Sequence, residues 1–188
     1  MPRIDPAPRD QWEPLFGDAA PLHLQIYAHA PAMAQAMAAW STSVYMDNTL
    51  DPRLMELVRL RVAFHNQCRS CMATRYNAGF EAGVDEGLVC SLENPPEADD
   101  LTPAERAAIR YADLMCTNHL GVDEAVLDDL REHFSEKALV ELGMLCAMTI
   151  GCGRLAATMA MVEDLPERFR DEGVVTPWGG TEADVVRA

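Results

Sequence analysis

The sequence predicts an all-α fold, and three observations support this prediction. Alanine and methionine, which favour helices, are abundant, whereas aromatic residues, which favour strands, make up only 6% of the chain. Apolar residues recur at intervals of three and four through most of residues 22–163, which is the period of an amphipathic helix. Proline, glycine and capping residues stand where these stretches begin or end. With 188 residues, the chain is expected to form one domain with terminal arms.

The N-terminal part of the chain divides into an arm and the first helices. Residues 1–22 are rich in proline and aspartate and lack helical periodicity, so we expect an irregular arm that could lie on a neighbouring subunit. Residues 22–46 are expected to contain one or two helices, with Pro31 in the first turn of the second. His23 and His29 are interpreted as structural or surface residues.

The next two helices carry the most informative motif of the chain. Asp51-Pro52 predicts a helix start, because aspartate caps a helix and proline needs no amide partner in the first turn. The apolar spacing predicts a helix over Glu56 to Asn66, and Asn66-Gln67 is a plausible break. A second helix is expected over Met72 to Phe80, so that Cys68 lies at its start.

The rest of the chain is expected to continue as helices. A short helix over residues 84–92 precedes an acidic loop, and Thr102-Pro-Ala-Glu105 reads as a capping box that opens the next helix. Another helix is expected over residues 122–134, and Ser135 caps a last, central helix that is apolar on most sides. Gly151-Cys-Gly153 either interrupts that helix or permits close packing. The helical domain is predicted to span 23–163, and residues 164–188 form a tail whose Pro177-Trp178 could pack on another subunit.

The charge balance of the chain excludes several classes of partner. Thirty acidic residues against fifteen basic ones give a formal net charge of −15. Such a chain repels phosphate backbones and anionic lipid surfaces, so neither nucleic acid nor a membrane is expected as a partner. No apolar run follows Met1, and no segment reads as a uniform membrane span, so we predict a cytoplasmic protein. Four of the six cysteines are scattered through apolar helical sequence, which suits a reducing compartment.

Cys68 and Cys71 form a Cys-x-x-Cys pair at a predicted helix start. Residues three apart lie on one face of a helix, so the two sulfurs could come within bonding distance. Unpaired amides at a helix start stabilise a thiolate, and such a thiol attacks peroxides or disulfides at neutral pH. The alternative interpretation is a pair of small buried residues, since free cysteines often lie in cores.

The motif resembles a known family. Glu56, Cys68 and Cys71, within the flanking phrase Leu54-Met-Glu-Leu-Val-Arg-Leu-Arg-Val-Ala, resemble the carboxymuconolactone decarboxylase superfamily, specifically its AhpD-like alkylhydroperoxidase branch. That family motif continues with a histidine four residues after the second cysteine, and here Arg75 stands there; Ser70 replaces a histidine that some members carry. Segments near Leu101-Thr-Pro-Ala-Glu and Phe134-Ser-Glu-Lys-Ala-Leu-Val-Glu-Leu also resemble the family, so the likeness covers most of residues 31–163.

The resemblance implies an AhpD-like helical fold, assembly into trimers or hexamers, and a thiol-dependent peroxidase that needs no metal or cofactor. Cys71 would attack a small hydroperoxide, and Cys68 would resolve the sulfenic acid to a disulfide that a thiol reductant partner resets. Glu56 would orient a water or accept a proton, and His65 could replace the missing histidine. A hydroperoxide or a lactone is the expected substrate.

Two arginines are further site candidates. If the chain folds back near Gln67, Glu56 comes opposite Arg75, which would then stabilise the thiolate or simply neutralise Glu56 in a buried ion pair. Arg154 stands alone in the apolar stretch from Met148 to Met161, which predicts either a carboxylate partner or an anionic substrate.

Three alternative functions stay open on the sequence alone. A lactone decarboxylase or related lyase would use Arg75 and Arg154 to hold the substrate and His65 or Glu56 to move protons. That branch of the superfamily generally lacks the cysteine pair. A non-enzymatic, redox-sensing oligomer is a second alternative. Zinc is a third, weaker one, because His65, Cys68 and Cys71 would need a fourth ligand from Cys90, His119 or a water.

Overall fold

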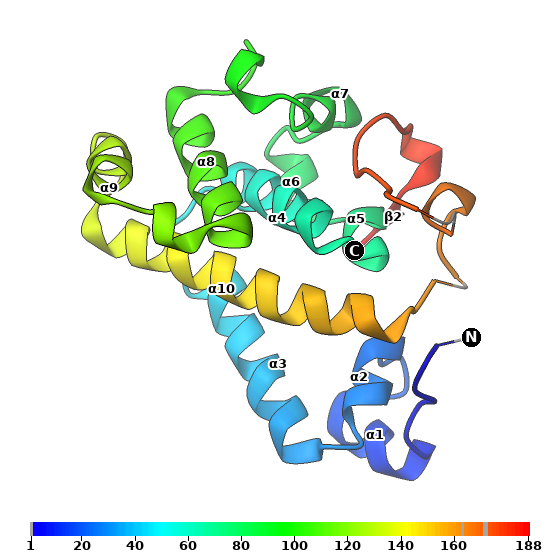
Figure 1. Cartoon of the computed structure of the whole chain (residues 1–188). Coiled ribbons are helices and arrows are strands. Elements are labelled where there is room, and N and C mark those ends of the chain that lie inside the picture. The colour runs from blue at the N-terminus through cyan, green and yellow to red at the C-terminus, as the bar shows by residue number, and fades with distance from the viewer. Residues whose placement is uncertain (1, 163, 171–172) are drawn as a thin grey trace.

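The computed structural model describes residues 2–162, 164–170 and 173–188, and the all-α prediction is confirmed (Figure 1). The long helix α10 (Glu136–Met159) crosses the molecule, and α4 (Pro52–Asn66) and α8 (Pro103–Thr117) pack against it and against each other. The other α-helices and strands are α1 (Arg9–Phe16), α2 (Leu22–Tyr27), α3 (Pro31–Met46), α5 (Arg69–Ala73), α6 (Asn77–Glu81), α7 (Glu86–Cys90), α9 (Glu124–Arg131), β1 (Thr74–Arg75) and β2 (Val186–Arg187). Short 3₁₀ helices lie at η1 (Pro95–Glu97), η2 (His119–Gly121), η3 (Glu167–Phe169) and η4 (Glu182–Asp184).

Helix α4 lies between α8 and α10, and ten of its fifteen residues are buried. It begins as the sequence predicts, because the Asp51 side chain accepts a hydrogen bond from the Arg53 amide at 2.8 Å and Pro52 occupies the first turn. The predicted break is also present: Gln67 adopts a left-handed conformation with φ of 48°. The chain therefore turns back at Gln67 and runs along α4.

The segment after this turn differs from the prediction of one helix over Met72 to Phe80. Cys68 is the N-cap residue of α5, as expected, but α5 ends after five residues. The strand β1 follows and pairs in parallel with β2 from the C-terminal tail, and α6 begins only after it. Backbone groups that would otherwise have continued the helix form hydrogen bonds to the C-terminal tail. The helical periodicity of the sequence does not predict this interaction.

The caps of the later helices agree with the sequence. Thr102 and Glu105 form both hydrogen bonds of the predicted capping box at the start of α8. Ser135 caps α10 by accepting a bond from the Ala138 amide at 3.2 Å. Helix α10 continues through Gly151-Cys-Gly153 without interruption, and of the two glycines only Gly153 serves close packing. A Cβ built on Gly153 would lie only 2.4 Å from Nδ2 of Asn66 in α4.

Helix α10 meets the length and hydropathy of a membrane-crossing helix, with a mean hydropathy of 1.5 over its most apolar window. The sequence-based expectation that no segment reaches these values was therefore wrong. Composition and length alone are weak evidence, because the core helix of a soluble protein has the same properties. In this fold α10 packs against α3, α4, α8 and α9, and 33% of that window is buried.

The two ends of the chain are more ordered than the sequence predicted. Helix α1 lies inside the segment expected to be irregular, and it buries Trp12 in a small cluster with Ala7, Ala20 and Ala28. This eight-residue helix contains a proline, which obscured its pattern. In Figure 1 α1 and α2 pack beside α3, and Ile26 of α2 also packs against Met159 at the end of α10.

The C-terminal tail folds onto its own chain, which corrects the expectation that Pro177-Trp178 packs on another subunit. The Trp178 ring lies 4.7 Å from the Phe64 ring, centroid to centroid, and Trp178 is buried. Gln67 accepts a hydrogen bond from the Val175 amide and donates one to the Val175 carbonyl. Residue 163, the predicted end of the helical domain, and residues 171–172 of the predicted tail lie outside the described residues, so the domain boundaries stay predictions.

Candidate active site

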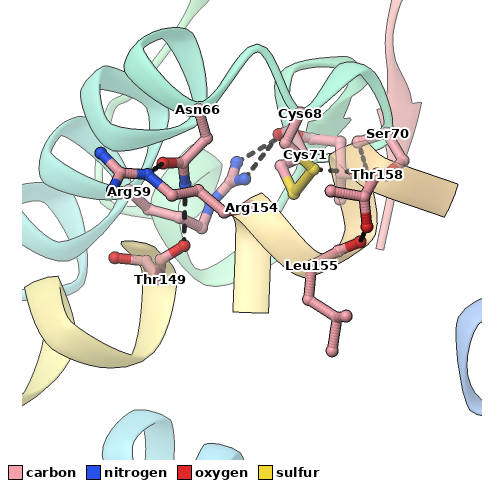
Figure 2. The surroundings of a disulfide bond; sticks show 10 residues. Arg59, Asn66, Cys68, Ser70, Cys71, Thr149, Arg154, Leu155 and Thr158 are labelled. Atoms are coloured by element: carbon pink, nitrogen blue, oxygen red, sulfur yellow. Dashed lines mark hydrogen bonds between the residues drawn. A yellow bond between two sulfur atoms is a disulfide. The ribbon is translucent and has the colours of Figure 1, made fainter. Parts of the chain in front are cut away.

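Cys68 and Cys71 are joined by a disulfide at the start of α5, with their Cα atoms 5.2 Å apart (Figure 2). The two sulfurs have different surroundings. Cys68 is completely buried, and Cys71 is partly exposed. A reagent from outside can therefore reach the pair only at Cys71, unless the protein opens.

A cavity of about 400 Å³ lies beside Cys71. One wall comes from α2 and α3, the opposite wall from α10, and the remaining wall from α4 and the segment that follows Cys68. Its lining is mainly apolar and aromatic and includes Leu24, Tyr27, Met37, Tyr45, Tyr76, Met148 and Ala156. Arg59, Ser70, Thr149 and Cys152 add polar groups.

Glu56 is buried behind this cavity in an ion pair with Arg59, and not with Arg75 as expected. Arg59 Nε and Nη2 each donate to a Glu56 carboxylate oxygen at 2.7 Å. The predicted fold-back is present, because the Tyr76 amide donates to Glu56 Oε1 at 3.1 Å. An arginine one turn along α4 reaches the carboxylate first, so Arg75 has no access to it.

Arg59 also links Glu56 to the cysteine segment. Its Nη1 donates to the Cys71 carbonyl and its Nη2 to the Thr74 carbonyl, both at 2.7 Å. Burial disfavours the guanidinium cation, but the neighbouring Glu56 carboxylate outweighs this cost and raises the pKa of Arg59. The positive end of a buried ion pair therefore faces the backbone of Cys71.

Arg75 has a structural position. It is 1% exposed and donates to both carboxylate oxygens of Glu86, at 2.7 and 2.9 Å. It also donates to the Met72 and Pro177 carbonyls, which fixes the C-terminal tail against the end of α5. Among the described residues that line the Cys71 cavity, Arg75 is not present.

His65 lies in a separate cluster of charged residues. Its Nε2 is 2.6 Å from Oδ1 of Asp113 on α8, and Arg61 donates to the same carboxylate. Burial alone would raise the pKa of Asp113, but hydrogen bonds from His65 and Arg61 lower it. His65 does not belong to the described lining of the Cys71 cavity, so it does not take the position of the missing family histidine.

Arg154 is on the surface of α10, which corrects the prediction of a buried guanidinium with a carboxylate or ligand partner. Its Nε donates to Asn66 Oδ1 at 3.2 Å and its Nη2 to the Cys116 carbonyl at 2.8 Å (Figure 2). Asn66 in turn donates to the Thr149 carbonyl. Arg154 thus tethers the end of α4, one turn before Cys68, to α8 and α10.

The structure adds three cavity residues that the sequence analysis missed. The pairing of Arg59 with Glu56 could have been predicted from the sequence, because their spacing places both side chains on one face of α4. Tyr45 and Tyr76 come from segments far apart in sequence; their rings meet edge to face at 5.3 Å, and Arg59 lies 4.7 Å from the Tyr76 centroid. Burial, and then the nearby Tyr76, raises the pKa of Tyr45. No local pattern predicts such a pair.

Metal binding has no support in the part of the chain that the structure describes. There, no group of three or more His, Cys, Asp or Glu side chains is arranged to hold a metal ion. Two of the three expected zinc ligands, Cys68 and Cys71, are bonded to each other.

Comparison with known proteins gives relatives in sequence. The model of the carboxymuconolactone decarboxylase family matches residues 31–114, which include the glutamate and both motif cysteines. Two uncharacterized proteins of Mycobacterium tuberculosis, one from strain CDC 1551 / Oshkosh and one from strain H37Rv, are each 40% identical over 126 residues. The match covers 64% of this chain, and the chain spans 44% of the length of these curated relatives.

Solved structures share the fold. A peroxidase-related protein with an alkylhydroperoxidase AhpD core from Ralstonia eutropha is 22% identical with a TM-score of 0.66, and the match covers 86% of each chain. A peroxidase-related protein from Silicibacter is 19% identical with a TM-score of 0.62, covering 84% of this chain and 86% of that one. The debrominase Bmp8, in complex with 2,3,4-tribromopyrrole, is 19% identical with a TM-score of 0.69, covering 84% and 89%. Residues 31–114 therefore match the carboxymuconolactone decarboxylase family, and the chain has the AhpD-like fold of these structures.

Proposed function

We propose that this protein is a thiol-dependent peroxidase that reduces organic hydroperoxides through a Cys68–Cys71 dithiol–disulfide cycle. The observation that carries the proposal is the asymmetry of the pair: one sulfur borders a cavity of substrate size and the other is sealed from solvent. A peroxidatic thiol must meet the substrate, whereas a resolving thiol only has to reach its neighbour. The family and the AhpD-like fold support this class of chemistry.

The cycle balances with one external reductant. The Cys71 thiolate attacks the terminal hydroperoxide oxygen, the O–O bond breaks, and the alcohol leaves with a proton while Cys71 becomes a sulfenic acid. The Cys68 thiol then attacks this sulfur, which forms the disulfide and releases water. A dithiol, or two thiols, returns two electrons and two protons and becomes oxidised itself.

The cavity favours this reaction over lactone decarboxylation. Decarboxylation of a carboxylate-bearing lactone would require cations that hold the substrate, and Arg75 and Arg154 were the sequence candidates. Arg75 is engaged with Glu86, and Arg154, which does not line the cavity, is bound to the Asn66 side chain and the Cys116 carbonyl. Arg59 borders the cavity, but the Glu56 carboxylate neutralises it. An apolar hydroperoxide suits this lining better, and the aromatic ligand of the debrominase fits the same fold.

The proposed assembly is a homo-oligomer, a trimer or hexamer as in relatives of this fold. Large apolar side chains remain exposed on α3, namely Met33, Trp40 and Met46, and on α10, namely Val140, Met144 and Leu155. Burying such side chains between copies would be favourable. Light scattering after size-exclusion chromatography tests this, and a monomer at micromolar concentration would contradict it. Cys90, Cys116, Cys146 and Cys152 are free thiols, which supports a reducing, cytoplasmic location.

Serine variants test the cycle. Reduced protein is mixed with cumene hydroperoxide, and consumption of peroxide is followed with a dithiol present. We expect Cys71→Ser to abolish turnover, whereas Cys68→Ser still reacts once and accumulates a sulfenic acid on Cys71 that dimedone traps for mass spectrometry. A wild-type Cys71 that reacts no faster than free cysteine would reject peroxidase function. Equal rates in the two variants would reject the assigned roles.

A further inference from the structure

A second cavity, of about 340 Å³, lies on the other side of Ser70 from the Cys71 cavity. Ser70 and Ala156 line both cavities, so the two spaces adjoin across these two small side chains. Their chemistry differs. The Cys71 cavity is apolar and aromatic, whereas the second one is lined by Arg3, Arg69 and Arg170 together with Gln67 and several small or apolar residues.

The three guanidinium groups come from three separate segments of the chain: the N-terminal arm, the cysteine helix and the C-terminal tail. Arg69 donates to the Gly173 carbonyl, Arg3 to the Thr158 carbonyl and Arg170 to the Leu165 carbonyl. Within the described residues, neither Arg3 nor Arg170 forms an ion pair with a carboxylate. Both residues are exposed, and each guanidinium has more N–H donors than the one carbonyl contact uses.

This grouping runs against the overall charge of the chain. Acidic residues outnumber basic ones two to one, and yet three arginines surround one cavity next to the redox pair. The exposed guanidinium groups of Arg3 and Arg170 at this cavity attract anions to that place, and arginine pairs especially well with carboxylates because its planar fork matches their geometry.

We propose that the two cavities together bind one amphipathic anion, with its hydrocarbon chain in the Cys71 cavity and its carboxylate at Arg3 and Arg170. The proposal rests on the peroxidase function and narrows its substrate class to hydroperoxides of long-chain carboxylic acids. The polar head lies among exposed arginines, where it keeps part of its hydration. The apolar chain crosses Ser70 and Ala156 and brings the hydroperoxide group beside Cys71.

Binding is tested first without any peroxide. Laurate, below its critical micelle concentration, is titrated calorimetrically into the oxidised protein, and its methyl ester and dodecyl phosphate are titrated in parallel. We expect laurate to bind more tightly than the ester, and Arg3→Gln/Arg170→Gln to weaken laurate binding about fivefold at low salt, as expected for the loss of two exposed ion pairs. The matched control is Arg9→Gln/Arg110→Gln, which removes the same charge from exposed arginines elsewhere.

A second readout locates the hydrocarbon chain. In reduced protein, laurate should slow alkylation of Cys71 by iodoacetamide in the wild type and in the control variant, and protect it less in Arg3→Gln/Arg170→Gln. Equal laurate affinities in the two double variants, or an ester that binds as tightly as the acid, would overturn the proposal. Tighter binding of dodecyl phosphate than of laurate would overturn the assignment of a carboxylate.

Turnover then separates this inference from the proposed function. Linoleic acid hydroperoxide should be consumed with a lower KM than its methyl ester, and the difference should shrink in Arg3→Gln/Arg170→Gln. If no hydroperoxide is consumed while laurate binding still depends on these arginines, the peroxidase function fails and the anion site stands. If both hydroperoxides are consumed equally well by all variants, the peroxidase function stands and the anion site fails.

Discussion

Glu56 and Arg59 form a bidentate ion pair in which the guanidinium lies between the Glu56 carboxylate and the backbone carbonyls of Cys71 and Thr74. Both side chains are at most 5% exposed. In the family pattern a glutamate and a histidine act together beside the second cysteine. Here the Glu56 carboxylate does not line the cavity, and the paired Arg59 guanidinium contacts the backbone of the cysteine segment.

Replacement of Glu56 by glutamine tests whether Glu56 acts as a base for Cys71 or as the counter-charge of Arg59. If Glu56 acted as a base for Cys71, Glu56→Gln would slow alkylation of the reduced protein at neutral pH. We expect no such slowing. Without its carboxylate partner, Arg59 exerts more of its positive charge on Cys71, so the pH midpoint of the Cys71 alkylation rate should stay the same or move to lower pH. The measurement is the iodoacetamide rate at Cys71 between pH 5 and 10.

The same variant should be less stable, because it leaves a buried cation without its counter-charge. Loss of one partner of a buried pair costs roughly 3–5 kcal/mol, and the cost here is reduced by whatever hydrogen bonds glutamine retains. Urea unfolding gives this value. Arg59→Lys is the control, since it keeps the charge but loses the bidentate geometry. A neutral-pH alkylation rate that falls in Glu56→Gln and not in Arg59→Lys would restore the family role of Glu56.

Arg75 should stabilise the fold and not the thiolate. Arg75→Met leaves the Glu86 carboxylate, which is 11% exposed, without its partner and removes the bond to the Pro177 carbonyl, so we expect a loss of roughly 3 kcal/mol in urea unfolding. Amide exchange should rise in residues 173–188, because Arg75 and β1 hold that tail.

A compensating substitution distinguishes this from a role in catalysis. Arg75→Met/Glu86→Leu removes both charges and should recover much of the lost stability. The Cys71 alkylation profile should match the wild type in this double variant. A profile that stays shifted after stability has recovered would show that the Arg75 charge acts on the cysteine.

The Asp113 cluster predicts a pH dependence of stability. Hydrogen bonds from His65 and Arg61 lower the pKa of Asp113 in the folded protein despite its burial. A carboxyl group with a lowered folded pKa contributes stability that is complete above its unfolded value, about 3.9, and is lost as the pH falls through the folded value. The wild type should therefore be more stable than Asp113→Asn at pH 6, and this difference should shrink below about pH 4. Urea unfolding at several pH values measures it, and a difference independent of pH would contradict this explanation.

Local signals predicted the elements of this fold and the position of the motif. Asp51, Thr102 and Ser135 each cap the helix assigned to them, and the turn at Gln67 lies where two helical patterns meet. These features depend on neighbours within four residues, which a single sequence displays. The disulfide pair was found for the same reason, because Cys68 and Cys71 are only three residues apart along the chain.

Partners that come from distant segments were not predictable in this way. Arg75 was expected to meet Glu56, but Glu86 from α7 and the tail carbonyl of Pro177 bind it. His65 was expected near the cysteines, but Asp113 on α8 holds it on another face of α4. In each case the partner of the side chain depended on which helices pack together.

Gly153 provides a last prediction, because it fixes how closely α10 approaches the turn before Cys68. A Cβ at this position would lie 2.4 Å from Asn66 Nδ2, and Asn66 bridges the end of α4 to Thr149 and Arg154. Gly153→Ala must displace Asn66, so we expect a loss of about 1–3 kcal/mol, as for overpacking in a core. Gly151→Ala is the matched control in the same helix, since nothing lies within 4 Å of its Cβ, and it should gain roughly 0.5–1 kcal/mol from helix propensity. Urea unfolding of the two variants measures both values, and equal shifts would mean that the close approach at Gly153 has no energetic weight.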